Sequence, residues 1–254
     1  LSFDEEVGCT GAPPMIEAMQ GVLPKGDVVI VGEPSMMKAV TGHKGGNAYM
    51  THMIGFEVHS SIYYQGVSAI HEAARLIQWA NEQNEANAAA TPAPMAAMFD
   101  PPYTTWHVGT IEGGTADNIT AKDCHFNMGY RAVPGDDPVA LDAMYFAKVN
   151  EVKVAMQVIH PEADIKLTPK FAVPPLLPET DGAAETLARV ITGDNASHVV
   201  SYGTEAGQFQ AAGYSAVVCG PGDIAQAHQP NEFIEVAQFN AGHQFMRDLL
   251  KKLA

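Results

Sequence analysis

The stretch Val28-Val29-Ile30-Val31-Gly32-Glu33-Pro34 joins four apolar residues to a glycine, a carboxylate and a proline. An apolar run of this length, ended by a turn signal, is typical of a strand buried on both faces of a sheet. Pro34 disfavours helical backbone at Glu33, so we expect the strand to end before this carboxylate. Ligand sites of α/β sheets gather at the carboxyl ends of strands. The stretch therefore predicts an α/β fold with Glu33 at a site, or, as the alternative, Glu33 in a surface turn.

A second acidic cluster, Asp4-Glu5-Glu6, precedes this strand. It follows Leu1-Ser2-Phe3, which we interpret as the end of another strand, and a short helix is expected after Gly11. Three consecutive acids repel one another unless a cation or solvent intervenes, so the triplet indicates either a metal site or a solvated acidic turn. The chain begins with Leu1 rather than Met, and we expect it to be a fragment.

Residues 43–172 have a different pattern, which indicates an inserted domain. The elements expected there are strand 47–57, helix 68–85, strands 104–111 and 123–131, a helix beginning at Asp136-Asp137-Pro138, and strand 163–169. Their order, β-α-β-β-α-β, is that of a ferredoxin-like α+β unit with an antiparallel sheet.

The chain returns to strand–helix alternation after residue 172. The expected elements are a helix near 181–192, strand 198–202, a helix after Thr204, strand 215–219 and a closing helix that reaches Leu253. We therefore predict one α/β domain made of residues 1–42 and 173–254, interrupted by the α+β insertion at 43–172.

Charge and composition exclude several classes of protein. Among 254 residues, 14 are basic and 29 acidic, so the formal charge is 14 − 29 = −15, which disfavours nucleic acid and anionic membrane surfaces as partners. No apolar run approaches the roughly 18 residues of a transmembrane helix. The three cysteines are far apart and odd in number, which favours a reducing compartment and predicts a cytoplasmic location.

A third site candidate, His228, lies in a loop beyond Cys219-Gly220-Pro221-Gly222. Neutral imidazole is the commonest protein metal ligand, although a loop histidine can equally lie in solvent. Together with Glu5, Glu6 and Glu33, His228 makes an incomplete two-metal hydrolase site on three strand-end loops, because two metal ions need more protein ligands than these.

The inserted domain carries its own polar candidates. His59-Ser60-Ser61 follows a predicted strand and indicates an oxyanion donor, a serine nucleophile with its base, or a plain polar loop. The serine alternative lacks a G-x-S-x-G elbow. Asn118, after the Gly113-Gly114 turn, can make amide hydrogen bonds to a ligand, and the Arg131 guanidinium can bind a carboxylate. The alternative is that Gly113-Gly114 only forms a hairpin turn and that Arg131 is a surface charge.

A further corner, Tyr202 to Gly207, predicts a strand that turns into the N-terminus of a helix. Gly203, Thr204 and Glu205 lie in this corner, which suits a substrate carboxylate or simply caps the helix.

Several motifs occur together in a specific order along nearly the whole chain. They are S-F-D-E-E-V-G at 2–8, V-G-E-P at 31–34, H-K-G at 43–45, H-S-S at 59–61, G-G-T-A-D-N at 113–118, and G-P-G at 220–222 followed by A-H-Q-P-N-E at 227–232. This combination closely resembles the dizinc metallopeptidase and deacylase family that includes succinyl-diaminopimelate desuccinylase. The resemblance implies a zinc-peptidase-like α/β catalytic domain with an inserted ferredoxin-like dimerisation, or lid, domain.

The resemblance also implies a role for each site residue. Glu5 would be the general base, Glu6 and His228 would ligate one zinc, and Glu33 would ligate the other. His59 would reach the active site of the partner subunit and stabilise the oxyanion. The residues expected near the substrate carboxylate or the shared pocket are Asn118, Arg131, Gly203 and Thr204.

The implied activity is hydrolysis of the amide bond of an N-acyl amino acid by a homodimer with two Zn²⁺ per subunit, Co²⁺ or Mn²⁺ being possible replacements. G-T-E-A at 203–206 and Q-A-H-Q-P-N-E-F at 226–233 resemble the versions of these motifs in family members that act on N-acetylornithine, and the absence of the N-x-I-P proline at 118–121 resembles some of the same members. The alternatives are another acyl amino acid, a dipeptide, or a dimerising scaffold without activity. The family's H-x-D motif and bridging aspartate lie upstream of D-E-E, so we expect this chain alone to be inactive.

Overall fold

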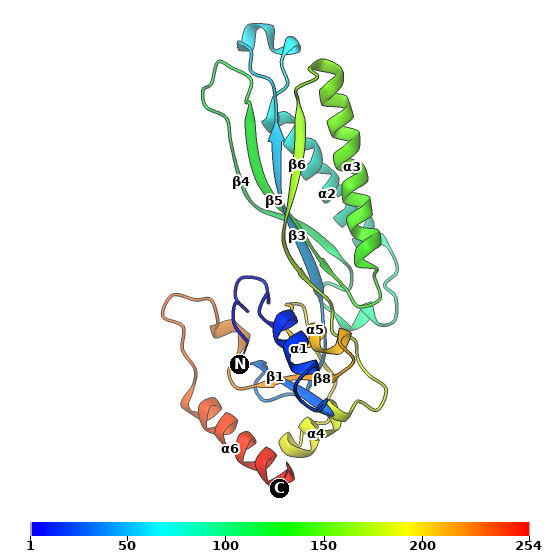
Figure 1. The fold of residues 1–254 in the computed structure, drawn as a ribbon, viewed down its shortest axis with the longest axis vertical. Helices are drawn as coiled ribbons and strands as arrows, with labels where there is room; N and C mark the ends of the chain where they lie inside the picture. Colours follow the sequence, from blue (N-terminus) through cyan, green and yellow to red (C-terminus); the bar gives the residue numbers. More distant parts are fainter. Residues whose placement is uncertain (1, 254) are drawn as a thin grey trace. The chain divides into compact units, whose positions relative to one another are not determined.

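The computed structural model describes residues 2–253, which form two compact units (Figure 1). Unit 1 contains Leu1–Gly45, Met98–Asp100 and Val173–Ala254, and unit 2 contains Gly46–Ala97 and Pro101–Ala172. Each unit has its own sheet and its own buried core. No helix within the described residues is long and apolar enough to cross a membrane.

Unit 1 is built on a mixed four-stranded sheet with the order β1-β8-β2-β7. β1 runs parallel to β8 and β2 runs parallel to β7, whereas β2 and β8 are antiparallel. Its elements are α1 (Ala12–Gln20), β1 (Val28–Pro34), β2 (Val40–His43), α4 (Ala183–Thr192), β7 (His198–Val200), α5 (Ala206–Ala211), β8 (Ser215–Gly220) and α6 (Val236–Leu253).

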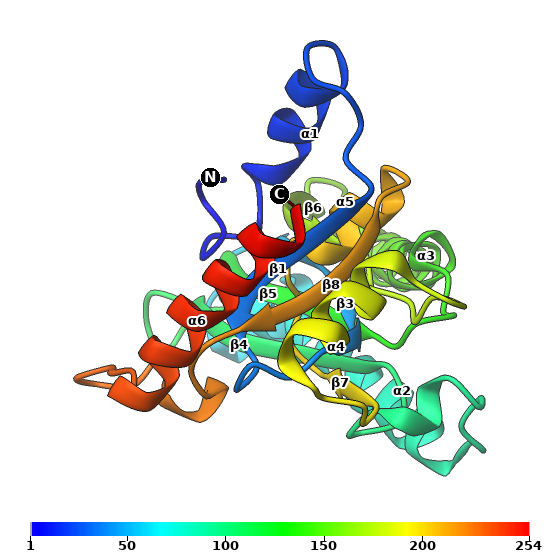
Figure 2. The same ribbon diagram turned by 90° about the horizontal axis from the view of Figure 1, so that it is seen from below.

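Helices cover both faces of this sheet (Figure 2). α1 and α5 pack on one face, where Ile16 and Phe209 contact a core that contains Val218. α4 and α6 pack on the other face, where Ala188 and Phe245 join the core around Val217. Alternate residues of β8 therefore serve opposite cores, as expected for a strand buried on both sides.

Three details differ from the sequence-based expectation. β1 is only partly buried apart from Val31, because it lies at the edge of the described sheet rather than inside it. It also continues through Glu33 to Pro34, with a register shift after Val31. The predicted strand at 1–3 is absent, since Ser2 and Phe3 have no regular structure and Leu1 lies outside the described residues.

Unit 2 has a second four-stranded sheet, with the order β4-β5-β3-β6. Its elements are β3 (Gly45–Ile54), the 3₁₀ helices η1 (Ser60–Gln65) and η2 (Ala96–Met98), α2 (Ala69–Ala89), β4 (Thr105–Gly113), β5 (Asp123–Ala132), α3 (Pro138–Ile159) and β6 (Asp164–Val173). α2 and α3 lie along one face and leave the other face open (Figure 1). The predicted fold class, α/β with a ferredoxin-like α+β unit, is confirmed.

Strict alternation along β5 separates the two faces of the unit 2 sheet. Cys124, Phe126 and Met128 are fully buried against the helices, whereas Asp123 and His125 are exposed. Successive side chains of a strand point to opposite faces, so apolar and polar residues at every second position specify the register.

A buried hydroxyl pair gives a first test of this core. Tyr145 is fully buried on α3, and its hydroxyl lies 2.5 Å from Oγ1 of Thr51 on β3. We expect Tyr145→Phe to lower the free energy of unfolding by about 1–3 kcal/mol, because the Thr51 hydroxyl then stays buried without this partner. Urea unfolding measures the change. The double variant Thr51→Val/Tyr145→Phe should recover part of it, and the exposed Tyr64→Phe serves as the matched control. A Tyr145→Phe chain as stable as the parent would contradict the expectation.

Candidate functional site

A tight turn presents Glu5 and Glu6 on unit 1. The backbone N–H groups of Gly8 and Cys9 both donate to the Glu5 carbonyl, at 3.0 and 2.9 Å. Asp4 and Cys9 adopt left-handed backbone, with φ of 58° and 56°, which costs energy for residues other than glycine. Gly11 is required where the turn closes, since a Cβ there would lie 2.0 Å from the Phe3 carbonyl oxygen.

Cys9 positions the Glu5 side chain through a hydrogen bond. Its thiol donates to Glu5 Oε1 at 3.4 Å, and its carbonyl accepts from Gln208 Nε2 at 3.0 Å. Burial, with a contribution from the Glu5 charge, raises the pKa of Cys9 to about 12. The thiol therefore stays protonated at neutral pH and acts as a hydrogen-bond donor to the carboxylate.

Glu6 points toward His228 from the same turn. Nε2 of His228 lies 3.7 Å from Glu6 Oε2, and both side chains are mostly exposed, by 72% and 75%. His228 has a left-handed φ of 57°, and its backbone N–H donates to Glu232 Oε2 at 2.9 Å. Two residues far apart in sequence thus meet as an imidazole–carboxylate pair.

Glu33 lies at the carboxyl end of β1, where β1 and β8 come very close. A Cβ on Gly220 would lie 2.2 Å from the Gly32 carbonyl oxygen, so this position requires glycine. Tyr202 donates its hydroxyl to the Pro34 carbonyl at 2.8 Å and connects the end of β1 to the corner after β7.

The electrostatics of Glu33 reveal a carboxylate cluster. Burial, followed by repulsion from Glu5, Glu6 and Glu205, raises the pKa of Glu33 to about 7, while His228 acts in the opposite direction. A positive charge at this position would relieve the repulsion, which is the electrostatic condition of a cation site.

Glu205 is the carboxylate that the sequence does not predict to join this cluster. It is only 7% exposed, and Ser2 Oγ donates to its Oε2 at 2.6 Å. Its Oε1 is buried and makes no hydrogen bond within the described part of the chain. A buried carboxylate oxygen without a partner is costly and suits a ligand position. The sequence signal that could have indicated Glu205 is its position, because Gly203-Thr204-Glu205 follows a predicted strand, as Glu33 does.

The rest of this corner is organised by backbone contacts. Thr204 is buried, and its Oγ1 accepts from the Ala206 N–H at 3.1 Å, which matches the helix-cap alternative for this residue. Gly203 is half-buried just before it. Their predicted place beside the substrate carboxylate stays a prediction.

His43, from the H-K-G motif, supports the corner from inside unit 1. It is fully buried, and its Nε2 accepts from the Gly207 N–H at 3.2 Å. Its Nδ1 therefore carries the proton and donates to the Lys44 carbonyl at 2.9 Å. Burial lowers the pKa of His43 to about 4, so the ring is neutral and acts as a structural anchor for the start of α5.

Unit 2 brings together two of its predicted site residues. His59 caps η1, with Nδ1 accepting from the Ser61 N–H at 3.2 Å, so its proton is on the other nitrogen, Nε2. The neighbouring Ser60 N–H donates to the Asn118 carbonyl at 2.8 Å. The His59 side chain is exposed, which leaves Nε2–H available to a ligand.

The serine alternative has one element in place: Ser61 Oγ lies 2.8 Å from His59 Nδ1. No carboxylate in the described residues is hydrogen-bonded to the other ring nitrogen, so the base lacks the orienting group of a hydrolase triad.

Arg131 lies apart from this pair. It occupies the far end of β5, eight residues from Asp123, a separation of about 27 Å along a strand. Its guanidinium lies 5.7 Å from the centre of the Phe171 ring, beside a hollow of about 500 Å³ on the open face of the sheet. Unit 2 therefore groups His59 with Asn118 and not with Arg131.

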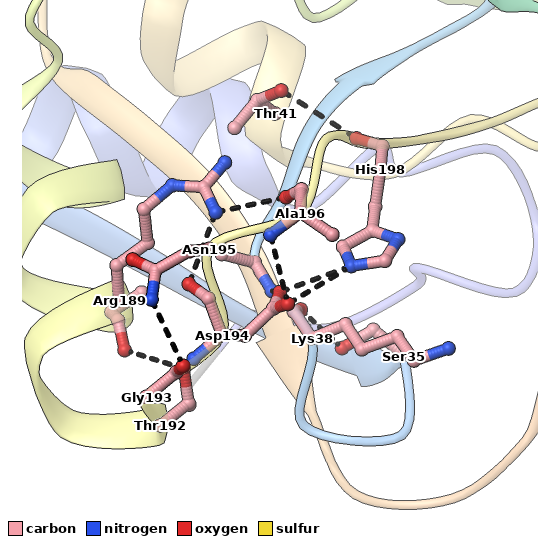
Figure 3. A network of polar contacts seen from close by, with 12 residues as sticks. Ser35, Lys38, Thr41, Arg189, Thr192, Gly193, Asp194, Asn195, Ala196 and His198 are labelled. Carbon is pink, nitrogen blue, oxygen red and sulfur yellow. Dashed lines mark hydrogen bonds and ion pairs between the residues drawn. The ribbon is translucent and has the colours of Figure 1, made fainter.

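Unit 1 also has a hollow, of about 400 Å³, whose neighbouring polar residues hold the fold together. It is bordered by Met37, Asp194 and Phe245 among others, and none of the predicted site residues lines it. Asp194 accepts hydrogen bonds from the Ala39 N–H and from His198 Nε2, which ties the start of β2 to β7 (Figure 3). Arg189 donates to the Asp194 and Ala196 carbonyls in the same network.

A different group of metal-ligating side chains lies in unit 2. Among residues 2–253, one group of three His, Cys, Asp or Glu residues has ligand atoms within 4.8 Å of one another, namely His52, Asp123 and His125. The predicted ligands Glu6, Glu33 and His228 are not part of that group. Their assignment rests on the carboxylate cluster and on the resemblance.

Comparison with known proteins agrees with the resemblance. Residues 41–157 match the family model described as a peptidase dimerisation domain. The chain is 34% identical to the acetylornithine deacetylase of Myxococcus xanthus over 243 residues, which cover 93% of this chain and 59% of that protein. It is 31% identical to the N-acetyl-L-citrulline deacetylase of Xanthomonas campestris, over 84% of this chain and 55% of that protein. The chain thus spans less than two thirds of either relative.

Solved structures show the same fold at low sequence identity. A tripeptidase from Staphylococcus aureus superposes with a TM-score of 0.72 at 19% identity, over 98% of this chain and 62% of that one. An M20 family metallo-carboxypeptidase from Sulfolobus solfataricus has a TM-score of 0.68 at 17% identity, over 98% of this chain and 68% of that one. Residues 41–157 thus match a peptidase dimerisation domain, and the chain is similar in sequence to acetylornithine deacetylases and shares its fold with the two peptidases.

Proposed function

We propose that the protein to which these residues belong hydrolyses the amide bond of an N-acyl amino acid, with N-acetylornithine as its substrate and two zinc ions as cofactors. The observation that carries this proposal is the carboxylate cluster of unit 1, where burial, followed by repulsion from Glu5, Glu6 and Glu205, raises the pKa of Glu33 to about 7, and where Glu6 lies 3.7 Å from His228. Because the chain spans 59% of the Myxococcus relative, the activity is proposed for the whole protein rather than for residues 1–254 alone.

The donor set of the cluster fits a divalent metal. Carboxylate oxygens and an imidazole nitrogen are ordinary zinc ligands, and the unpartnered Oε1 of Glu205 adds a buried acceptor to the same cluster. Glu6 and His228 would hold one ion, and Glu33 the other. When bound, zinc would polarise the acyl carbonyl and lower the pKa of a water molecule.

Glu5 acts as the general base in this proposal. It takes a proton from the attacking water and delivers that proton to the departing amine. The Cys9 thiol, which stays protonated, fixes the Glu5 carboxylate by donating to Oε1. Glu5 and Glu6 are sequence neighbours in a turn, which lets one carboxylate bind metal while the other handles the proton.

The inserted domain supplies the remaining groups. We assign residues 43–172 to dimerisation and residues 1–42 and 173–254 to two segments of a catalytic domain. His59 Nε2–H would donate to the oxyanion in the partner subunit of a homodimer, an assignment supported by its tautomer and its exposure. We assign substrate binding to four residues: Asn118, Arg131, Gly203 and Thr204. We also propose that the enzyme is cytoplasmic.

Two other functions remain as test outcomes. The Xanthomonas relative is named for N-acetyl-L-citrulline, whose side chain is neutral where that of ornithine is cationic. A dimerising scaffold without activity is the second. A substrate panel of N-acetylornithine, N-acetylcitrulline and a dipeptide, assayed with the whole protein, separates these outcomes.

Glu5 and Glu6 offer a paired test of the metal assignment. In the whole protein, Glu5→Gln should lower kcat by about 10²–10⁴-fold and leave two metal ions per chain, because only the proton carrier is lost. Glu6→Gln should instead lower the metal content. Metal analysis and kinetics on the same preparations measure both effects, and Glu17→Gln on the exposed side of α1 is the control. A Glu5→Gln enzyme with full activity would overturn the role of Glu5.

The Glu33 cluster also has a measurable effect on stability in the metal-free chain. The folded-state pKa of about 7 lies above the ordinary value of 4.5, so the folded chain holds a proton that the unfolded chain has released. Stability is therefore expected to fall as the pH rises from about 4.5 to about 7 and to level off above that, by at most about 3 kcal/mol, and by less where solvent screens the partly exposed carboxylate. Urea unfolding in the presence of a chelator measures this slope.

Glu33→Gln should flatten the slope, whereas Glu17→Gln should leave it unchanged. Equal slopes for the parent chain and the Glu33→Gln variant would show that Glu33 does not carry the repulsion.

A further inference from the structure

The open face of the unit 2 sheet carries a group of side chains that the proposed hydrolysis does not use. His52 lies on β3, and Asp123 and His125 lie on the neighbouring strand β5. One potential ligand atom from each lies within 4.8 Å of the other two. We propose that these three residues bind one divalent ion of the zinc type on the dimerisation domain.

The strand geometry explains why the three side chains converge. Asp123 and His125 are two positions apart on β5, so both point to the open face, while Cys124 between them is buried under the helices. His52 extends from the adjacent strand, and its ring stacks on that of His125 with centroids 3.9 Å apart and an angle of 19°. Side chains on neighbouring strands of one sheet are held more rigidly than side chains on loops.

The existing contacts require only side-chain movement to accept an ion. His52 Nε2 is already 2.8 Å from Asp123 Oδ1. In a tetrahedral zinc site with bonds of about 2.1 Å, ligand atoms lie roughly 3.3 Å apart, so the three atoms need to move by about 1 Å. The two stacked imidazoles must splay, which rotation about their side-chain torsions permits on an exposed surface.

The chemistry of the set selects the kind of ion. Two imidazole nitrogens and one carboxylate oxygen suit Zn²⁺, Co²⁺, Ni²⁺ and Cu²⁺ better than Mg²⁺ or Ca²⁺, which prefer oxygen ligands alone. The side chains are accessible, with His52 and Asp123 exposed by 27% and 52%. An ion can therefore enter from solvent, and water can complete its coordination.

Glu112 gives the site a second acidic side chain besides Asp123. In the β4–β5 ladder, Glu112 is directly opposite His125, so the two side chains share the open face at a Cβ separation of about 4.5–5.5 Å. Its carboxylate adds negative charge next to the proposed ion, and the net charge of −15 adds to the attraction for cations.

Calorimetric titration of this chain with ZnCl₂ tests the proposal. We expect one zinc-binding event to be weakened in each of three variants, His52→Ala, His125→Ala and Asp123→Asn. The loss of zinc affinity should exceed the roughly 10–100-fold loss that follows when a residue outside the ligand set is removed. The matched control is His71→Ala, which removes an exposed histidine of α2 in the same unit. Glu112→Gln should have a smaller effect than any ligand variant.

CoCl₂ provides a spectroscopic readout that does not depend on calorimetry. Bound Co²⁺ should give visible absorption bands of an imidazole-containing site in the parent chain, and these bands should be lost in His52→Ala and His125→Ala. Zinc affinity that is unchanged in all three ligand variants, or reduced equally by His71→Ala, would overturn the proposal.

The test is independent of the proposed hydrolysis. A Glu33→Gln/His228→Ala chain should keep this zinc-binding event, because it alters only the carboxylate cluster of unit 1. Failure of the His52 site would leave the substrate panel unaffected, and an inactive whole protein would leave the calorimetric result unaffected.

Discussion

Repulsion among the carboxylates of Glu5, Glu6, Glu33 and Glu205 is the constraint on which the candidate site of unit 1 depends. Burial and these neighbours raise the pKa of Glu33 to about 7. A fold gains nothing in stability from such a cluster when no cation is present, and the turn that presents Glu5 and Glu6 adds two non-glycine residues in left-handed backbone. Both costs are of the kind that functional sites carry.

Three features of unit 1 hold parts of this cluster in place. The neutral ring of His43 anchors the start of α5 beside Glu205, and the thiol of Cys9 holds Glu5. Gly220 lets β8 approach the end of β1 closely enough for Glu33 to lie at the edge of the cluster. These contacts fix Glu5 from the Cys9 side and the corner of Glu205 from the His43 side, whereas Glu6 remains mostly exposed.

Unit 2 solves a different physical problem. One face of its sheet packs against the helices and the other is exposed, and the alternation along β5 places successive residues on opposite faces. The same alternation that buries Phe126 and Met128 places Asp123 and His125 together in solvent, next to His52. The residues that match a peptidase dimerisation domain thus carry a polar sheet face on which the zinc-type site is proposed.

The sequence by itself determined the α/β class, the β-α-β-β-α-β order of the insertion and the position of Glu33 near the carboxyl end of β1, whereas the strand expected before the Glu5-Glu6 pair is not formed by Ser2 and Phe3. These features depend on local patterns: apolar period, proline and glycine positions, and acids that follow strands. Strand β2 and the edge position of β1 were not predictable in this way, because both depend on which strands pair across the chain.

Only the tertiary structure decided which distant residues meet. Glu205 joins Glu33 because the start of α5 packs beside the Glu5-Glu6 turn. Two hydrogen bonds connect these segments across 203 and 199 residues of chain, from Ser2 to Glu205 and from Gln208 to the Cys9 carbonyl. His52 meets Asp123 and His125 because β3 and β5 are neighbours in the sheet although they are 70 residues apart in sequence. Local propensity carries no information on such pairs, since their approach is set by strand order and core packing rather than by the residues next to them.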